Sequence, residues 1–265
     1  MQVISFLATK GGVGKTTLSY QFSKYLSQHG KKVLLLDLDS QRSLSSMFDL
    51  EEVTYTTENI FRGIGEVKVQ QVDDNIDLIP ASLNLGTSLL SDISMKPNKE
   101  LLLFMWFGKN YKDFDYDYVI LDLNPAWNLL TMNAATASDL IISPLEPSRF
   151  GYESHDKVIK GIEGLKEGVV DPRTLESYVI ADLKFIANRV KHNTTTSKEF
   201  LSQLETFDDV IGVIPEKEAI NASMLERKYV VDYLEEKDHM TQSDKKFIDT
   251  LENIFNEITK LGDED

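Results

Sequence analysis

The sequence predicts an α/β fold in which a mostly parallel, twisted sheet carries helices on both faces. Three observations predict this class. The apolar run at residues 2–8 leads through a glycine-rich loop into a helical pattern at residues 15–28. Two further apolar runs, at residues 32–39 and 116–122, end in aspartate, and such runs are typical of buried parallel strands. With 265 residues, the chain is also long enough to bury a sizeable core.

The glycine-rich loop at residues 10–17 reads Lys-Gly-Gly-Val-Gly-Lys-Thr-Thr. Glycines let the backbone turn sharply, so several N–H groups can meet the α- and β-phosphates of a nucleotide at the start of the next helix. Lys15 then reaches the β- and γ-phosphates, and the Thr16 hydroxyl binds Mg²⁺. The general pattern has a glycine where Thr9 stands, and a glycine-rich turn without a ligand is the alternative. The predicted phosphate site is Gly11, Gly12, Val13, Gly14, Lys15, Thr16 and Thr17.

Two of the predicted strands deliver acidic side chains to the same edge of the sheet as this loop. Ligands of open α/β sheets bind outside the carboxyl ends of the strands, so Asp37, Asp39 and Asp122 are expected near the phosphates. Asp122 ends an apolar strand in the Walker B pattern, in which the carboxylate faces the metal opposite Thr16. For Asp37 and Asp39, a pair of solvated acids at a strand end is the alternative.

The remaining elements follow from apolar periodicity and from glycine and proline stops. Gly30 ends the first helix. Between residues 50 and 99 the pattern is weak, with a short helix at 57–62, a strand at 76–80 and a loop or irregular helix at 83–95. The later helices are expected at 101–107, 129–137, 152–166, 195–204 and 243–261, and the later strands at 139–144, 178–187 and 210–214.

Three segments together resemble the deviant Walker ATPases, the family of ParA, MinD and the nitrogenase iron protein. They are the loop with a second lysine, Lys10, at its head, the segment from Asp37 to Gln41, and the strand ending at Asp122. The resemblance implies a P-loop NTPase fold in a single domain over residues 1–265, with ATP and Mg²⁺ as cofactors. Both nucleotide-sensing loops depart from the family pattern, because Ser40 replaces one proline and Asn124 another.

The resemblance also implies catalytic roles. Lys10 would cross a nucleotide-sandwich homodimer to touch the phosphates of the partner subunit, and Lys15 would bind the phosphates of its own. Asp39 would orient the attacking water. The metal residues would be Thr16, Asp37 and Asp122.

The base site is implied at two further positions. Asn188, after the strand at 178–187, matches an asparagine that hydrogen-bonds adenine in the family, and Pro215 matches a proline beside the base. An asparagine amide can read a purine edge because it both donates and accepts hydrogen bonds. An asparagine at a helix boundary is often a cap, and that alternative for Asn188 stays open.

Composition narrows the class of protein. The chain has 28 basic and 43 acidic residues and a net charge of −15, which argues against a generally adhesive surface for nucleic acid or membrane. It has no cysteine, which excludes a thiolate-held iron–sulfur cluster and hence the nitrogenase branch. No apolar run approaches the roughly 20 residues of a membrane span. We expect no signal peptide, no anchor and no DNA-reading N-terminal extension, and therefore a cytoplasmic protein that is nucleoid-associated when ATP-bound.

Contact with DNA would require a local basic patch. In ParA-type proteins, basic residues near the last strand bind DNA phosphates without sequence preference. Here that region reads Glu216-Lys217-Glu218-Ala219, and a solvated surface is the alternative for any single lysine. The candidate DNA-binding residues are Lys184, Arg189, Lys191, Lys198, Lys217, Arg227 and Lys228.

An amphipathic helix is expected at residues 243–261. MinD proteins bind membranes through such a helix, but membrane-surface helices are basic on their polar face. The polar face here carries Asp249, Glu252 and Glu257, so packing on the domain or on a partner is favoured over a membrane.

The sequence therefore predicts a ParA-type ATPase for plasmid or chromosome partition, which slowly converts ATP and water to ADP and phosphate. The expected partners are a second copy on ATP binding, nonspecific DNA, and a ParB-like centromere-binding adaptor that stimulates hydrolysis. The alternatives are a MinD-like membrane-associated ATPase or a protein-cargo-positioning ATPase. A scaffold without turnover is disfavoured because Asp37, Asp39 and Asp122 are all present.

Overall fold

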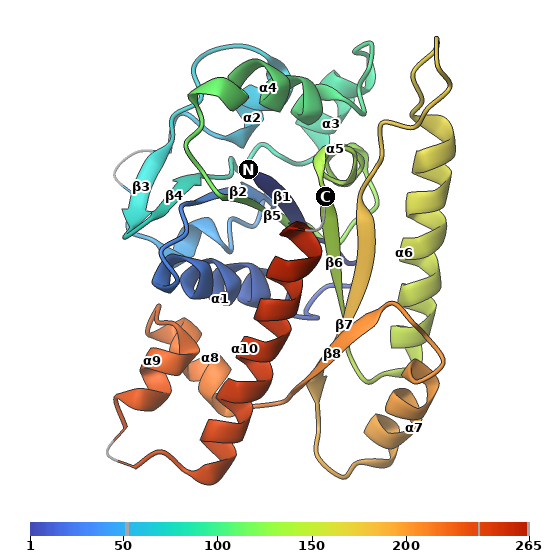
Figure 1. The fold of residues 1–265 in the computed structure, drawn as a ribbon. Helices are drawn as coiled ribbons and strands as arrows, with labels where there is room; N and C mark the ends of the chain where they lie inside the picture. The colour runs from blue at the N-terminus through green and yellow to red at the C-terminus, as the bar shows by residue number, and fades with distance from the viewer. Residues whose placement is uncertain (51–52, 238, 264–265) are drawn as a thin grey trace.

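A computed structural model describes residues 1–50, 53–237 and 239–263 (Figure 1). Within these residues, eight strands form one sheet in the order β3-β4-β2-β5-β1-β6-β7-β8. Only the β3–β4 pair is antiparallel; the other neighbours are parallel. The strands are β1 (Gln2–Phe6), β2 (Val33–Leu38), β3 (Gln70–Asp73), β4 (Ile76–Ile79), β5 (Tyr118–Leu123), β6 (Leu140–Leu145), β7 (Asp182–Val190) and β8 (Val210–Pro215).

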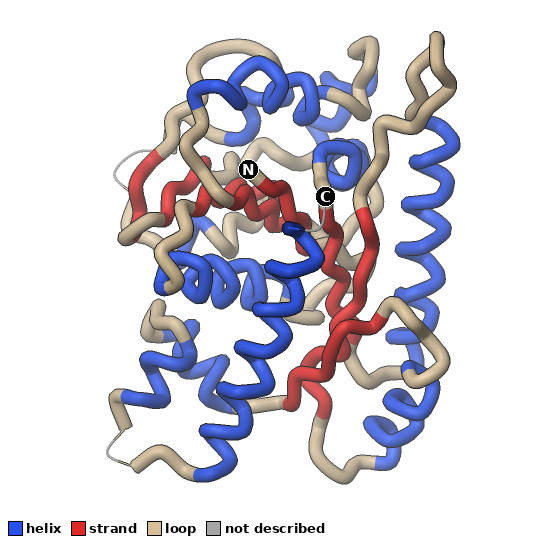
Figure 2. Tube along the Cα trace, viewed as in Figure 1, coloured by secondary structure: helices blue, strands red, loops and turns tan. Residues whose placement is uncertain are grey.

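Helices cover both faces of this sheet, as Figure 2 shows. One face carries α1 (Lys15–Gln28), α8 (Glu218–Leu225), α9 (Val230–Glu235) and α10 (Gln242–Asp263). The other carries α2 (Thr57–Arg62), α3 (Thr87–Ser94), α4 (Leu102–Asn110), α5 (Leu129–Ala137), α6 (Arg149–Gly168) and α7 (Thr195–Leu204). The described residues also form two short 3₁₀ turns, η1 (Ser45–Met47) and η2 (Tyr111–Asp113).

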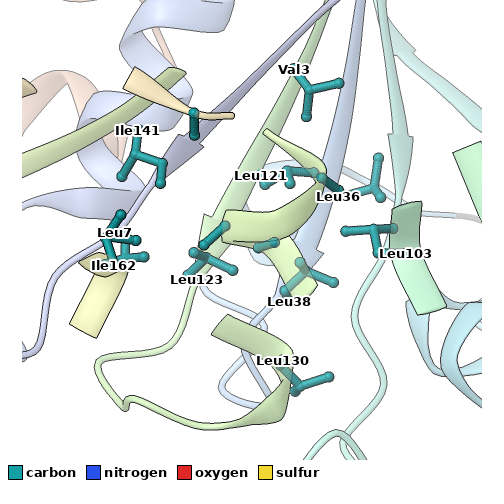
Figure 3. Packing of buried hydrophobic residues seen from close by; sticks show 14 of the residues in the cluster. Val3, Leu7, Leu36, Leu38, Leu103, Leu121, Leu123, Leu130, Ile141 and Ile162 are labelled. Carbon is teal, nitrogen blue, oxygen red and sulfur yellow. The ribbon is translucent and has the colours of Figure 1, made fainter. Parts of the chain in front are cut away.

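The central strands supply both apolar cores. Successive strand residues point to opposite faces of a sheet, so Leu34 and Leu36 of β2 enter the core under α2 to α7, while Val33 and Leu35 enter the core under α1 and α10. Figure 3 shows Leu36 in the first core with Leu121 of the neighbouring strand. Burial on both sides explains why these strands read as continuous apolar runs, and the predicted α/β fold is confirmed.

The last helix, α10, packs on its own chain. Leu251, Phe255 and Ile258 on its apolar face are 0% exposed. The ring of Phe255 lies 5.2 Å from that of Phe22 on α1, measured between centroids, and a Cβ on Gly262 would collide with the side chain of Gln2 in β1. The apolar face is thus unavailable to a membrane. In the part of the chain that the structure describes, no helix has the length and hydropathy of a membrane span.

Most predicted elements are confirmed, and the helices at 15–28, 57–62, 129–137 and 195–204 have the predicted bounds. The strand predicted at 178–187 was wrong at both ends, because β7 begins at Asp182 and ends at Val190. Val179 and Ala181 are buried without belonging to a strand, so their apolar side chains resembled the start of one. The irregular segment predicted at 83–95 contains the regular helix α3, and β3, α8 and α9 had not been predicted.

Candidate active site

The loop between β1 and α1 is shaped by two glycines with left-handed backbone angles. Gly12 has φ 79° and Gly14 has φ 100°, a region that favours glycine. A Cβ on Gly14 would also lie 2.3 Å from Nδ2 of Asn188. The chain turns from this loop directly into α1, whose first residue is Lys15. Gly11 and Gly12 are exposed, so a ligand can approach their backbone closely.

Lys15 carries a buried positive charge at this turn. The residue is 7% exposed, and among the described residues nothing forms an ion pair or hydrogen bond with its ammonium group. Burial lowers the pKa of the Lys15 ammonium, while the charges of Asp122 and Asp39 act in the opposite direction. A desolvated cation without a contacting anion fits a phosphate ligand.

Two carboxylates, Asp37 and Asp122, lie on neighbouring strands in direct register. Both are 0% exposed. The Thr16 hydroxyl donates to Oδ2 of Asp122 at 2.8 Å, and the Ser19 hydroxyl donates to its Oδ1 at 3.2 Å. The backbone N–H and the hydroxyl of Ser45 donate to Oδ2 of Asp37 at 2.8 and 2.7 Å. The structure brings the three predicted metal residues together, and it adds two serines that sequence reasoning missed.

This buried carboxylate pair suits a divalent cation. Burial raises the pKa of Asp122, and the charge of Asp37 raises it further. Burial also raises the pKa of Asp37, against the opposing effect of its hydrogen bonds from Ser45 and from the Asp39 N–H. No cluster of three or more His, Asp or Glu that could hold a metal occurs in the described ranges. Mg²⁺ usually binds through one or two carboxylates together with phosphate and water, and Asp37 and Asp122 supply such a pair.

A hollow of about 430 Å³ opens over the loop. Asp39 lies in its wall, where its Oδ1 accepts a hydrogen bond from the Gln41 N–H at 3.0 Å. Met47 and Met224 also line this hollow, and sequence reasoning had not placed them near the predicted phosphate site. The full lining is Gly11, Gly12, Gly14, Lys15, Thr16, Thr17, Asp39, Gln41, Ser43, Met47, Leu123, Pro125, Arg189 and Met224.

A larger hollow of about 600 Å³ lies at the opposite ends of the parallel strands, beside Lys32, Asn75 and Tyr116. None of the predicted site residues lines it. We therefore assign the chemistry to the hollow over the loop.

The second lysine of the loop, Lys10, is held within its own subunit. Its ammonium pairs with the carboxylate of Glu146 and lies 3.4 Å from the hydroxyl of Ser148. Glu146 directly follows β6, at the same edge of the sheet as the predicted acids. Its position at a strand end was the signal that could have identified it.

The base-site residues lie on the last two strands. Asn188 and Pro215 line a hollow of about 150 Å³ beside Thr17, next to the larger hollow over the loop. Asn188 lies within β7, so the helix-cap alternative was wrong. Its Nδ2 donates to the carbonyl of Val13 at 2.8 Å, which leaves its amide oxygen for another donor.

The candidate DNA-binding residues do not form one patch. Lys184 lies near the start of β7, whereas Arg189 and Lys191 lie at its end and line one hollow with Glu146 and Glu216.

Most of these cations have partners. Lys184 pairs with Asp182, Lys191 with Glu216, Lys217 with Asp244, Arg227 with Asp49, and Lys228 with Glu226 and Glu236. Within residues 1–50, 53–237 and 239–263, Lys198 on α7 makes no ion pair.

Comparison with known proteins identifies relatives of this chain. The family described as an AAA domain matches residues 1–173. The chain is 30% identical to the virulence plasmid ParA family protein pGP5-D of Chlamydia trachomatis, over 83% of this chain and 89% of that protein. It is 28% identical to the sporulation initiation inhibitor protein Soj of Bacillus subtilis, over 69% of this chain and 79% of Soj.

A solved structure is similar over almost the whole chain. It is a plasmid partition protein from Borrelia burgdorferi B31 bound to AMPPNP, which is 26% identical, with 98% of each chain covered and a TM-score of 0.77.

Proposed function

This chain belongs to the ParA and MinD family of ATPases, and we propose that it is a ParA-type partition ATPase that hydrolyses ATP with Mg²⁺. The observation that carries the proposal is the loop between β1 and α1, which has one lysine at its head and another at the start of α1. Lys15 is buried without a contacting anion beside the pair Asp37 and Asp122, while Lys10 lies at the loop's head. The relative that binds AMPPNP supports ATP as the ligand.

The reaction is an in-line attack of water on the γ-phosphorus. A bond forms from the water oxygen to phosphorus while the bond to the bridging oxygen breaks, so that ADP is the leaving group; the inorganic phosphate formed keeps one water proton and passes the other to solvent. The loop and Lys15 bind the phosphates, and Asp39 accepts a hydrogen bond from the attacking water and orients it. Thr16, Asp37 and Asp122 would hold Mg²⁺, which would offset negative charge on the phosphate oxygens. Asn188 and Pro215 would border the adenine.

A second subunit completes the site in this proposal. Lys10 leaves Glu146 and reaches the phosphates bound by the partner subunit, so a lone subunit turns over slowly. Lys10→Ala is therefore expected to bind ATP as a monomer but to lose the ATP-dependent dimer and turnover. Sedimentation velocity and phosphate release measure the two effects, and normal hydrolysis by the variant would contradict the role of Lys10.

The ATP-bound dimer would bind nonspecific DNA through the candidate basic residues, and a ParB-like adaptor would stimulate hydrolysis and release it. Most of these cations form ion pairs within one subunit. Dimer formation would therefore have to break these ion pairs or bring the cations together on one surface. Protein on the nucleoid in its ATP-bound form and free in the cytoplasm otherwise is the expected distribution.

The test is binding to nonspecific duplex DNA with ATP, with ADP and without nucleotide, each at two salt concentrations. Binding that requires ATP and weakens as salt rises supports the proposal, because phosphate contacts release counterions. Lys15→Ala is the matched control, since it should bind DNA in no state. If the native protein binds ATP but never DNA, nonspecific DNA is refuted as a partner and a protein partner is favoured, since α10 packs its apolar face on its own chain.

A further inference from the structure

The end of β7 carries a β-bulge at Asn188 and Arg189. Ala187 is paired with Val213 and Val190 with Pro215, so two residues of β7 stand opposite one residue of β8. Arg189 adopts φ 56°, a left-handed conformation that non-glycine residues rarely take. Bulges of this kind re-aim side chains and are common beside active sites.

The bulge sends two neighbouring side chains to the same loop. Nδ2 of Asn188 donates to the carbonyl of Val13 at 2.8 Å, and Nη1 of Arg189 donates to the carbonyl of Gly12 at 2.7 Å. In a regular strand, neighbouring side chains point to opposite faces, so both could not reach consecutive carbonyls of one loop. The irregular backbone therefore lets Asn188 and Arg189 both hold the loop. We call these two hydrogen bonds the clamp.

The clamp fixes the direction of two peptide planes. In a trans peptide, the carbonyl and the following N–H point in opposite directions. Holding the carbonyls of Gly12 and Val13 toward β7 therefore turns the N–H groups of Val13 and Gly14 away from it. These N–H groups belong to the loop that lines the hollow of about 430 Å³. Gly12 and Gly14 would otherwise be free to rotate, because glycine has many accessible conformations.

We propose that Arg189, together with Asn188, is a positioning residue that preorganises the phosphate-binding loop before nucleotide arrives. The inference rests on the proposed binding of ATP by this loop. This role of Arg189 is separate from DNA binding, because the Arg189 guanidinium contacts the loop when no DNA is present. Preorganisation raises affinity by removing the cost of ordering the loop when the ligand binds.

The test compares the dissociation constants for fluorescent ATP and ADP analogues without DNA. Arg189→Ala is expected to weaken both by about tenfold, the usual effect of losing one charged hydrogen bond. Arg189→Lys should recover part of this loss, because lysine can still donate to the Gly12 carbonyl. Arg173→Ala, which removes an exposed arginine from the loop before β7, is the matched control and should bind like the native protein.

A second measurement reports the loop itself. In the nucleotide-free protein, hydrogen exchange of the amides at residues 11–14 should be faster in Arg189→Ala than in the Arg173→Ala control. Unchanged nucleotide affinity and exchange in Arg189→Ala would overturn the proposal. Weaker binding of ATP with unchanged binding of ADP would also overturn it, because that pattern indicates a direct contact with the γ-phosphate. If the native protein binds neither nucleotide, ATP binding itself fails, which is a distinct result.

Discussion

Glu146→Gln is expected to strengthen the ATP-dependent dimer. The change removes the negative charge that holds Lys10 in its own subunit and keeps the size of the side chain. If Lys10 must leave Glu146 before it can reach the partner subunit, weakening this pair lowers the free-energy cost of dimer formation.

The magnitude follows from the exposure of the pair. The Lys10 and Glu146 side chains are 33% and 25% exposed, so solvent screens the interaction, and about 1 kcal/mol for each pair is reasonable. Both subunits must release their lysine, so the dimer gains about 2 kcal/mol, or roughly thirtyfold in its association constant.

Sedimentation velocity with AMPPNP over a range of protein concentrations measures the dimer constant. Glu153→Gln is the matched control, because Glu153 is an exposed carboxylate on α6 whose nearest lysine, Lys157, is 3.8 Å away. It should leave the dimer unchanged. A weaker or unchanged dimer in Glu146→Gln would refute the reasoning and would indicate that the pair supports the site instead of restraining Lys10.

Three further outcomes are expected. Lys15→Ala should abolish nucleotide binding in calorimetry, since the loop loses its buried cation, and retained tight ATP binding would count against the phosphate site. Asp39→Ala should trap the ATP-bound dimer, because the attacking water loses its acceptor; rapid phosphate release would contradict that assignment. Phe255→Ala should lower the free energy of unfolding by about 3–5 kcal/mol in urea titrations, since it empties a fully buried site under α10, and a loss below 1 kcal/mol would be inconsistent with the packing.

Elements with strong local signals could be predicted from the sequence. The start of α5 is fixed by Asn128, whose side chain accepts hydrogen bonds from the N–H groups of Leu130 and Thr131, and the start of α7 by Thr194 in the same way. By contrast, α8 and α9 have only 8 and 6 residues and are followed by Glu226 and Glu236, without the glycine stop that Gly63 gives the equally short α2. The edge strand β3 is only partly buried and therefore lacks the apolar run of a central strand.

The candidate site likewise contains residues that could be located from the sequence and contacts that could not. The loop glycines, Lys15 and the acids at the strand ends could be located because strand, loop and helix follow one another along the chain. Glu146 could not be paired with Lys10, because the two residues are 136 positions apart and meet only once β6 lies beside β1. The bulge at Arg189 depends on the register between β7 and β8, which no single segment encodes.

The packing of α10 has a consequence for synthesis on the ribosome. The first strand and α1 emerge early, yet the core that they share with Phe255 needs a helix from residues 242–263, which emerges after every other element described here. Until then Phe22 and Tyr25 on α1 have no ring from α10 to pack against. This half of the core must therefore form after most of the chain has been translated, and a nascent chain stalled before α10 would present an apolar surface to chaperones.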